Sequence, residues 1–206
     1  MSLLINSLDE KQVINSYNFA RVADIVFSET VTKNQYSKLN DKDSEIIEEM
    51  DSSIFYVKKN FKLKENSIIF TNTYLVESLF SKLYSSNFKN ITIITSQTDQ
   101  AINNELYNLK PSCVSNWYST NVSCIKKDLF SIPLGLANEY SHKNLIQDNF
   151  QVFSNNVEKV NKLYLNFEEN TNYFHRNKLR KKLSNKSFVV SDKLTLDNSE
   201  YLKNLN

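Results

Sequence analysis

The stretch "NITIITSQTD", residues 90–99, decides how this sequence folds. Its first half is a near-continuous apolar run from Ile91 to Ile94, and its second half is polar and closed by Asp99. Such a run is typical of a strand that is covered on both faces, as strands of parallel sheets are. We therefore expect a buried parallel strand over residues 90–96. Asp99 then lies just beyond its carboxyl end, where α/β sheets gather ligand groups.

Further strands and helices alternate along the chain. The clearest segment of helical period, residues 74–86, follows Thr73, which is its expected N-cap. Two more helices are expected over residues 99–109 and 172–183. This alternation predicts an α/β fold with a mainly parallel, Rossmann-like sheet flanked by helices. The remaining strands are expected over residues 24–28, 53–59, 67–72, 129–134, 162–167 and 187–191.

A polar, asparagine-rich segment, residues 147–162, is the expected boundary between two domains. We expect a Rossmann-like domain over residues 1–150 that contains the parallel sheet. Residues 160–206 restart the strand–helix–strand pattern with too few elements for a complete domain. We therefore expect an incomplete second βαβ unit, whose two strands pair with each other in parallel and outside the first sheet. Its apolar side chains then need cover, which favours self-association. They are Leu163, Leu165, Phe188 and Val190.

The composition excludes several classes of function. With 25 basic and 23 acidic residues the net charge is +2, which gives no general case for nucleic acid or an anionic membrane as partner. Cys113 and Cys124 lack metal-ligand spacing, so we expect reduced thiols and no metal site. A single glycine rules out the G-x-G-x-x-G, Walker A and G-x-S-x-G motifs. No apolar run is long enough for a bilayer span or a signal-peptide core, so we expect a soluble, cytoplasmic protein.

Four residues have a functional interpretation beside a structural one. Asp99 is either the N-cap of the next helix or a catalytic carboxylate. Trp117 either packs in the core or stacks on a sugar face. Arg176 lies in the first turn of its helix, where a cation opposes the helix dipole and an anion is bound well. Gly135 follows Pro133 by two residues, and it marks either a close approach of the backbone to a ligand or a turn that needs positive φ.

Four segments, in this order, resemble the exostosin-like glycosyltransferases of bacteria and viruses. They are "ITIITSQTDQAIN", "VSNWYSTN", "LFSIPLGLAN" and "LYLNFEENTNYFHRNKLRKKL". The resemblance implies two Rossmann-like domains that face each other across a cleft, the GT-B architecture. It implies that the first domain binds a glycan acceptor and the second binds a nucleotide sugar. The reaction would transfer the sugar with inversion and without a metal or another cofactor.

The resemblance also implies roles for single residues, with Asp99 in the position of the catalytic base. Asp99, Asn121 and Gly135 are expected to converge on one cleft. The expected acceptor-cleft residues are Asn121, Trp117, Gly135, Asn138 and His142. The expected contacts to the donor phosphates are Thr171, Asn172 and Arg176.

Two features depart from the family pattern. Relatives often carry a histidine before the aspartate, where this chain has Ser96-Gln97-Thr98. The chain also ends before the segments that hold the donor in relatives, so we expect these 206 residues to transfer no sugar by themselves. The alternative interpretation is an α/β module without catalysis that binds a glycan or a protein partner.

Overall fold

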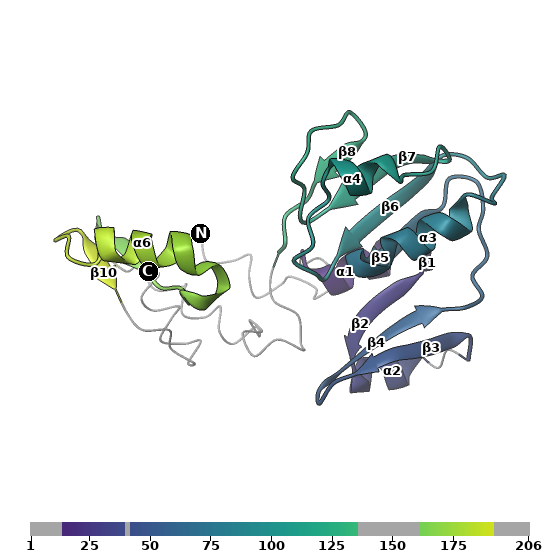
Figure 1. The fold of residues 1–206 in the computed structure, drawn as a ribbon. Helices are drawn as coiled ribbons and strands as arrows, with labels where there is room; N and C mark the ends of the chain where they lie inside the picture. The colour runs from purple at the N-terminus through teal and green to yellow at the C-terminus, as the bar shows by residue number, and fades with distance from the viewer. Residues whose placement is uncertain (1–13, 40–41, 136–160, 192–206) are drawn as a thin grey trace, which may run out of the picture. The chain divides into compact units, whose positions relative to one another are not determined.

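The computed structural model describes residues 14–39, 42–135 and 161–191 (Figure 1). These residues belong to two compact units, one that holds the described residues up to 135 and one that holds those from 161.

The first unit is built on a parallel sheet of five strands. Its order is β1-β5-β6-β7-β8, and every neighbouring pair is parallel. The expected α/β fold with a parallel sheet is therefore confirmed, and the strand over residues 90–96 lies at its centre. The five strands stand in the sheet in the order in which they occur in the sequence, so the strand order does not reverse anywhere among them. The strands are β1 (Ile25–Val26), β5 (Ile68–Asn72), β6 (Ile91–Ser96), β7 (Val114–Ser119) and β8 (Leu129–Ser131).

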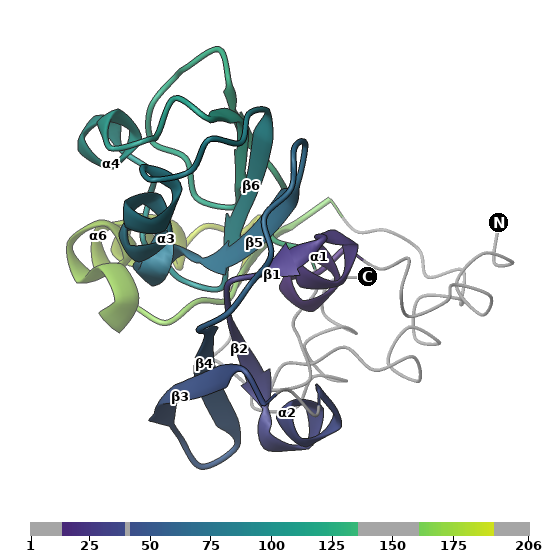
Figure 2. The same ribbon diagram turned by 90° about the vertical axis from the view of Figure 1, so that its right-hand side faces the viewer.

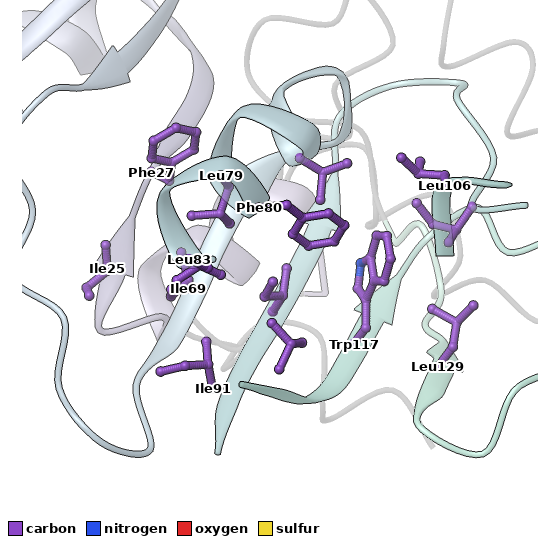
Figure 3. Close-up of a cluster of buried hydrophobic side chains, with 14 residues drawn as sticks. Ile25, Phe27, Ile69, Leu79, Phe80, Leu83, Ile91, Leu106, Trp117 and Leu129 are labelled. Atoms are coloured by element: carbon purple, nitrogen blue, oxygen red, sulfur yellow. The ribbon is translucent and has the colours of Figure 1, made fainter. Parts of the chain in front are cut away.

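Helices cover both faces of this sheet because its strands carry apolar side chains on both sides. α3 (Val76–Leu83) and α4 (Asn104–Asn108) pack on one face through Leu79 and Leu106 (Figure 3). Ile93 of the central strand belongs to the same cluster. α1 (Ser16–Val22) packs on the other face, where Ala20 meets Phe70 and Ile94. Ile93 and Ile94 point to opposite faces, as successive residues of a strand must.

The beginnings of two helices differ from the expectation. The 3₁₀ turn that leads into α3, Thr73–Leu75, is capped by Asn72, whose Oδ1 accepts a hydrogen bond from the Tyr74 N–H at 3.0 Å. The expected cap, Thr73, instead donates its hydroxyl to the Ser96 carbonyl at 3.3 Å. α4 begins after Asn103, whose side chain accepts from the Leu106 N–H. Asp99 is therefore not a helix cap.

A second, antiparallel sheet in the same unit was not expected. Its order is β2-β4-β3, made of β2 (Ser28–Thr32), β4 (Ser53–Lys58) and β3 (Ser44–Glu49). A short helix, α2 (Lys33–Leu39), follows β2 and lies beside this sheet, away from α4 (Figure 2). The predicted strand over residues 24–28 is in fact the passage from β1 into β2, so one chain segment serves both sheets.

Hydrogen bonds from β2 join the two sheets. The Ser28 hydroxyl lies 2.7 Å from the Thr71 hydroxyl and accepts from the Asn72 N–H at 3.0 Å. Two residues on, the Thr30 N–H donates to Gln97 Oε1 at 2.8 Å, and Gln97 Nε2 donates back to the Thr30 carbonyl at 3.0 Å. β2 therefore covers the carboxyl end of β5 and the first residue beyond β6.

The second unit contains β9 (Leu163–Leu165), α6 (Tyr173–Leu183) and β10 (Val189–Ser191). β9 and β10 pair with each other in parallel and belong to a sheet of their own, which confirms the expected pairing. Three of the four apolar residues expected to need cover are exposed, whereas Leu165 is buried. The exposed three are Leu163, Phe188 and Val190.

Gly135 follows the end of β8 and has φ +77°, in the left-handed region that favours glycine. A Cβ atom at this position would lie 2.0 Å from the carbonyl oxygen of Ile14, just before α1. The chain thus needs glycine here for both reasons weighed above, a positive φ and a close approach. The approach is to its own backbone.

We expect Gly135→Ala to lower the free energy of unfolding by more than about 1 kcal/mol, because the backbone conformation is strained and Ile14 has to move. Thermal and urea unfolding followed by circular dichroism measure the change. Leu134→Ala, at the exposed neighbouring position, is the control and should stay within about 0.5 kcal/mol of the unmodified chain. Equal stabilities for Gly135→Ala and the unmodified chain would contradict this account. Gly135→Asn tolerates the positive φ and so isolates the cost of the contact with Ile14.

Candidate functional site

Polar side chains gather where β6 and β7 end, at one edge of the parallel sheet. We call residues 96–100 and 119–121 the β6–β7 rim. Asn121 Nδ2 donates to the Thr98 carbonyl at 2.6 Å, and the Asn121 carbonyl accepts from the Ile102 N–H at 2.8 Å. The loop after β6 is therefore fastened on both sides of Asp99 to Asn121, the second residue beyond β7.

Asp99 is exposed on this fastened loop. Among the described residues its carboxylate has no hydrogen-bond or ion-pair partner. The loop around it is ordered by its own polar groups, since the Gln100 N–H donates to the Thr98 hydroxyl at 3.1 Å. A carboxylate that is open to solvent on such a loop can accept a hydrogen bond or a proton from a bound hydroxyl. Asp99 and Asn121, predicted to converge, do lie on joined loops.

Two buried polar atoms of the rim lack partners in the described part of the chain. They are the hydroxyl oxygen of Ser119, at the last residue of β7, and Oε1 of Gln100. Buried polar groups are nearly always hydrogen-bonded in native proteins, so each such group calls for a water or a ligand. The rim thus contains two buried polar atoms whose hydrogen-bonding capacity the described residues do not use.

Trp117 does not belong to this site. Its side chain is fully buried under α3, where the Phe80 ring meets it edge-on at 5.3 Å between ring centroids (Figure 3). Its Nε1 donates to the Thr95 hydroxyl at 2.9 Å. The expected acceptor-cleft role of Trp117 is therefore wrong, because a buried indole cannot stack on a sugar.

Of the remaining acceptor-side residues, the structure describes Gly135. Gly135 approaches Ile14, so its close contact is explained without a ligand. Asn138 and His142 lie outside the described residues.

The residues expected to hold the donor phosphates lie in the second unit. Thr171 and Asn172 form part of a 3₁₀ turn, Asn170–Asn172, directly before α6. Asn172 Oδ1 lies 3.0 Å from His175 Nδ1. Arg176 Nη1 donates to the Glu168 carbonyl at 2.7 Å, so this guanidinium already serves the preceding loop. The free N–H groups at the start of α6 receive no side-chain cap.

A second polar cluster was missed by the sequence analysis. Glu29, on β2, is fully buried, and its Oε2 accepts from Arg21 Nη2 of α1 and from the Tyr56 hydroxyl of β4. Burial raises the pKa of Glu29 from 4.5 to about 7, although Arg21 and Tyr56 both act to lower it. Burial also raises the pKa of Tyr56, so its hydroxyl stays protonated and donates. The three residues are far apart in sequence, and no local pattern could reveal the cluster.

No protein-family model and no curated protein matches this chain. Within residues 14–39, 42–135 and 161–191, no three histidine, cysteine or acidic side chains are grouped as metal ligands. In that same part of the chain, no helix is long and apolar enough to cross a membrane.

We expect Glu29 to make the stability of the first unit depend on pH. Its pKa is higher in the folded than in the unfolded chain, so its contribution is full below pH 4.5 and is lost as the pH rises to about 7. The loss amounts to about 3 kcal/mol, since each pKa unit corresponds to about 1.4 kcal/mol. Urea unfolding from pH 4 to pH 8 should show this decline for the unmodified chain relative to Glu29→Gln. Glu48→Gln, at an exposed position of β3, is the control and should keep the decline. A difference between the unmodified chain and Glu29→Gln that is constant over this pH range would contradict the assignment.

Proposed function

We propose that this chain is part of an inverting, metal-independent glycosyltransferase in which the β6–β7 rim binds the glycan acceptor. The observation that carries the proposal is the exposed carboxylate of Asp99, which has no partner within residues 14–39, 42–135 and 161–191 and lies on a loop that Asn121 fastens at the carboxyl edge of a parallel sheet. The order of the four sequence segments that resemble exostosin-like enzymes supports it. A soluble, cytoplasmic enzyme with a GT-B architecture is part of the same proposal.

In the proposed reaction, an acceptor hydroxyl donates a hydrogen bond to the Asp99 carboxylate. As its oxygen attacks the anomeric carbon of the donor, the proton passes to Asp99 and the bond to the leaving nucleoside diphosphate breaks. A positioned base contributes about 10² to 10⁴ in rate, and the hydrogen bond from Asn121 to the Thr98 carbonyl positions the backbone that carries Asp99. In this scheme the donor phosphates lie at the start of α6, with Thr171, Asn172 and Arg176.

The alternative is a binding module without catalysis, which needs the rim but no donor site. Such a module would recognise a glycan or a protein at the same rim without transferring a sugar.

Asp99→Asn should weaken oligosaccharide binding by about tenfold or more, because it replaces a charge-assisted hydrogen bond by a neutral one. Binding is measured first on an array of immobilised oligosaccharides and then by titration with the best one. Glu105→Gln, an exposed carboxylate on the neighbouring helix α4, is the matched control and should bind as the unmodified chain does. Amide resonances that shift outside residues 96–100 and 119–121, or an equal loss in both variants, would contradict the rim as acceptor site.

We expect the 206-residue chain to bind sugar nucleotides weakly and to transfer no sugar by itself. Transfer needs both substrates held in near-attack geometry, and the phosphate contacts at the start of α6 position the donor incompletely. Calorimetric titration with UDP-glucose, UDP-N-acetylglucosamine and GDP-mannose tests the binding. Sedimentation in parallel tests the self-association expected from exposed apolar side chains of the second unit. Tight donor binding by a monomer would show that the chain holds a complete donor site.

A further inference from the structure

A cavity of about 620 Å³ lies in the first unit, at the end of the sheet opposite to the β6–β7 rim. Asp24 and Ser67, which directly precede β1 and β5, both line it, and this places it at the amino ends of these parallel strands. Cavities of about 300 to 1,000 Å³ are the usual size of small-molecule sites. The cavity is thus distinct from the proposed acceptor site in both place and residues.

Cationic side chains predominate in the cavity wall. Four of them, Arg21, Lys58, Lys62 and Lys64, face two carboxylates, Asp24 and Glu65. Both carboxylates already serve the chain: Asp24 Oδ2 accepts from the Ile68 N–H at 2.8 Å, and Glu65 Oε2 accepts from the Lys89 N–H at 3.1 Å. The wall therefore carries a net positive charge that favours an anion.

Residues that do not line the cavity hold the Arg21 side chain in place. Its guanidinium is bonded to the buried Glu29 and lies 4.5 Å from the ring centroid of Tyr17. The hydroxyl of Tyr56, a residue that also lines the cavity, donates to the same carboxylate oxygen. A guanidinium has five N–H donors and Glu29 engages one of its nitrogens, so donors remain for a ligand. A donor fork held in this way loses little freedom when it binds a planar or tetrahedral anion.

The wall also contains apolar and aromatic side chains, beside the polar residues Asn60 and Ser67. Ile25, Val26, Leu39 and Phe61 line the cavity beside the charged groups. An inorganic anion alone would leave these surfaces and most of the volume unused. An occupant with an apolar body and one anionic group matches both the cationic and the apolar side chains of the wall.

We propose that this cavity binds a small organic anion, with its phosphate or carboxylate group on Arg21, Lys62 and Lys64 and its apolar part against Phe61 and Leu39. This proposal is based on the cavity at the amino end of the sheet, and it does not depend on the function proposed for the rim. Glu29 and Tyr17 act as positioning residues, because they hold the Arg21 guanidinium and do not line the cavity.

Phenyl phosphate is the first probe, with inorganic phosphate, phenol and benzoate in parallel titrations of the full chain. We expect phenyl phosphate to bind more tightly than inorganic phosphate or phenol, and to shift the amide resonances of residues 56–64. Benzoate distinguishes the two anionic groups: whichever of phenyl phosphate and benzoate binds more tightly identifies the preferred group. Inorganic phosphate that binds as tightly as phenyl phosphate, or shifts that map elsewhere, would overturn the proposal.

The double variant Lys62→Gln/Lys64→Gln should bind phenyl phosphate about tenfold more weakly. Both lysines are exposed, so the variant should fold normally. Lys82→Gln/Lys127→Gln removes the same charge at exposed positions outside the cavity wall, and it should change the affinity less than twofold. An equal loss in both double variants would show general charge attraction and no site.

Arg21→Lys keeps a positive charge beside Glu29 but removes the planar guanidinium with its several N–H donors. This variant should also weaken the binding of phenyl phosphate, and thermal unfolding reports whether its fold is kept. Unchanged affinity in a folded Arg21→Lys variant would contradict the role of the guanidinium.

Discussion

The hydrogen bonds of residues 28–30 are the constraint on which the first unit depends. This short stretch leaves the parallel sheet and enters the antiparallel one, and its polar groups are buried where the two sheets meet. Ser28 bonds to Thr71 and Asn72, and both backbone groups of Thr30 bond to the Gln97 side chain. Each such group would cost about 1–3 kcal/mol if it were left unpaired in the interior. β2 is thereby fixed across the carboxyl end of β5 and covers it. The part of this sheet edge that β2 leaves uncovered lies at the ends of β6 and β7.

The regular parts of the parallel sheet could be predicted because their signal is local. β5 and β6 have apolar residues on both faces, and α3 has one apolar face, so sequence alone revealed them. β7 gave no such signal, since polar Ser115 and Asn116 interrupt its apolar residues. α1 and α2 have seven residues each, too short to be stable without tertiary contacts, and their sequences show no strong helical period.

The candidate site also contains residues that could be predicted from the sequence and residues that could not. Asp99 and Asn121 follow strands of a parallel sheet, so their proximity at one edge could be predicted from order alone. Trp117 lies only four residues before Asn121, but the alternation of side chains along β7 turns it into the core beneath α3. The cluster of Arg21, Glu29 and Tyr56 depends on three separate elements, one of which, β2, had no sequence signal of its own.

The two polar regions of the first unit are built for different chemistry. At the rim, loop groups are joined by neutral hydrogen bonds, and the one exposed charge among residues 96–100 and 119–121 is Asp99; such a surface suits a neutral ligand rich in hydroxyls. At the cavity, cationic side chains predominate over acidic ones and lie beside apolar residues, and the buried Glu29 orients Arg21. Because opposite ends of parallel strands are separated by the length of the sheet, ligands at the two places would not compete for the same residues. A single rigid sheet can therefore hold both, and substitutions at one end should leave binding at the other unchanged.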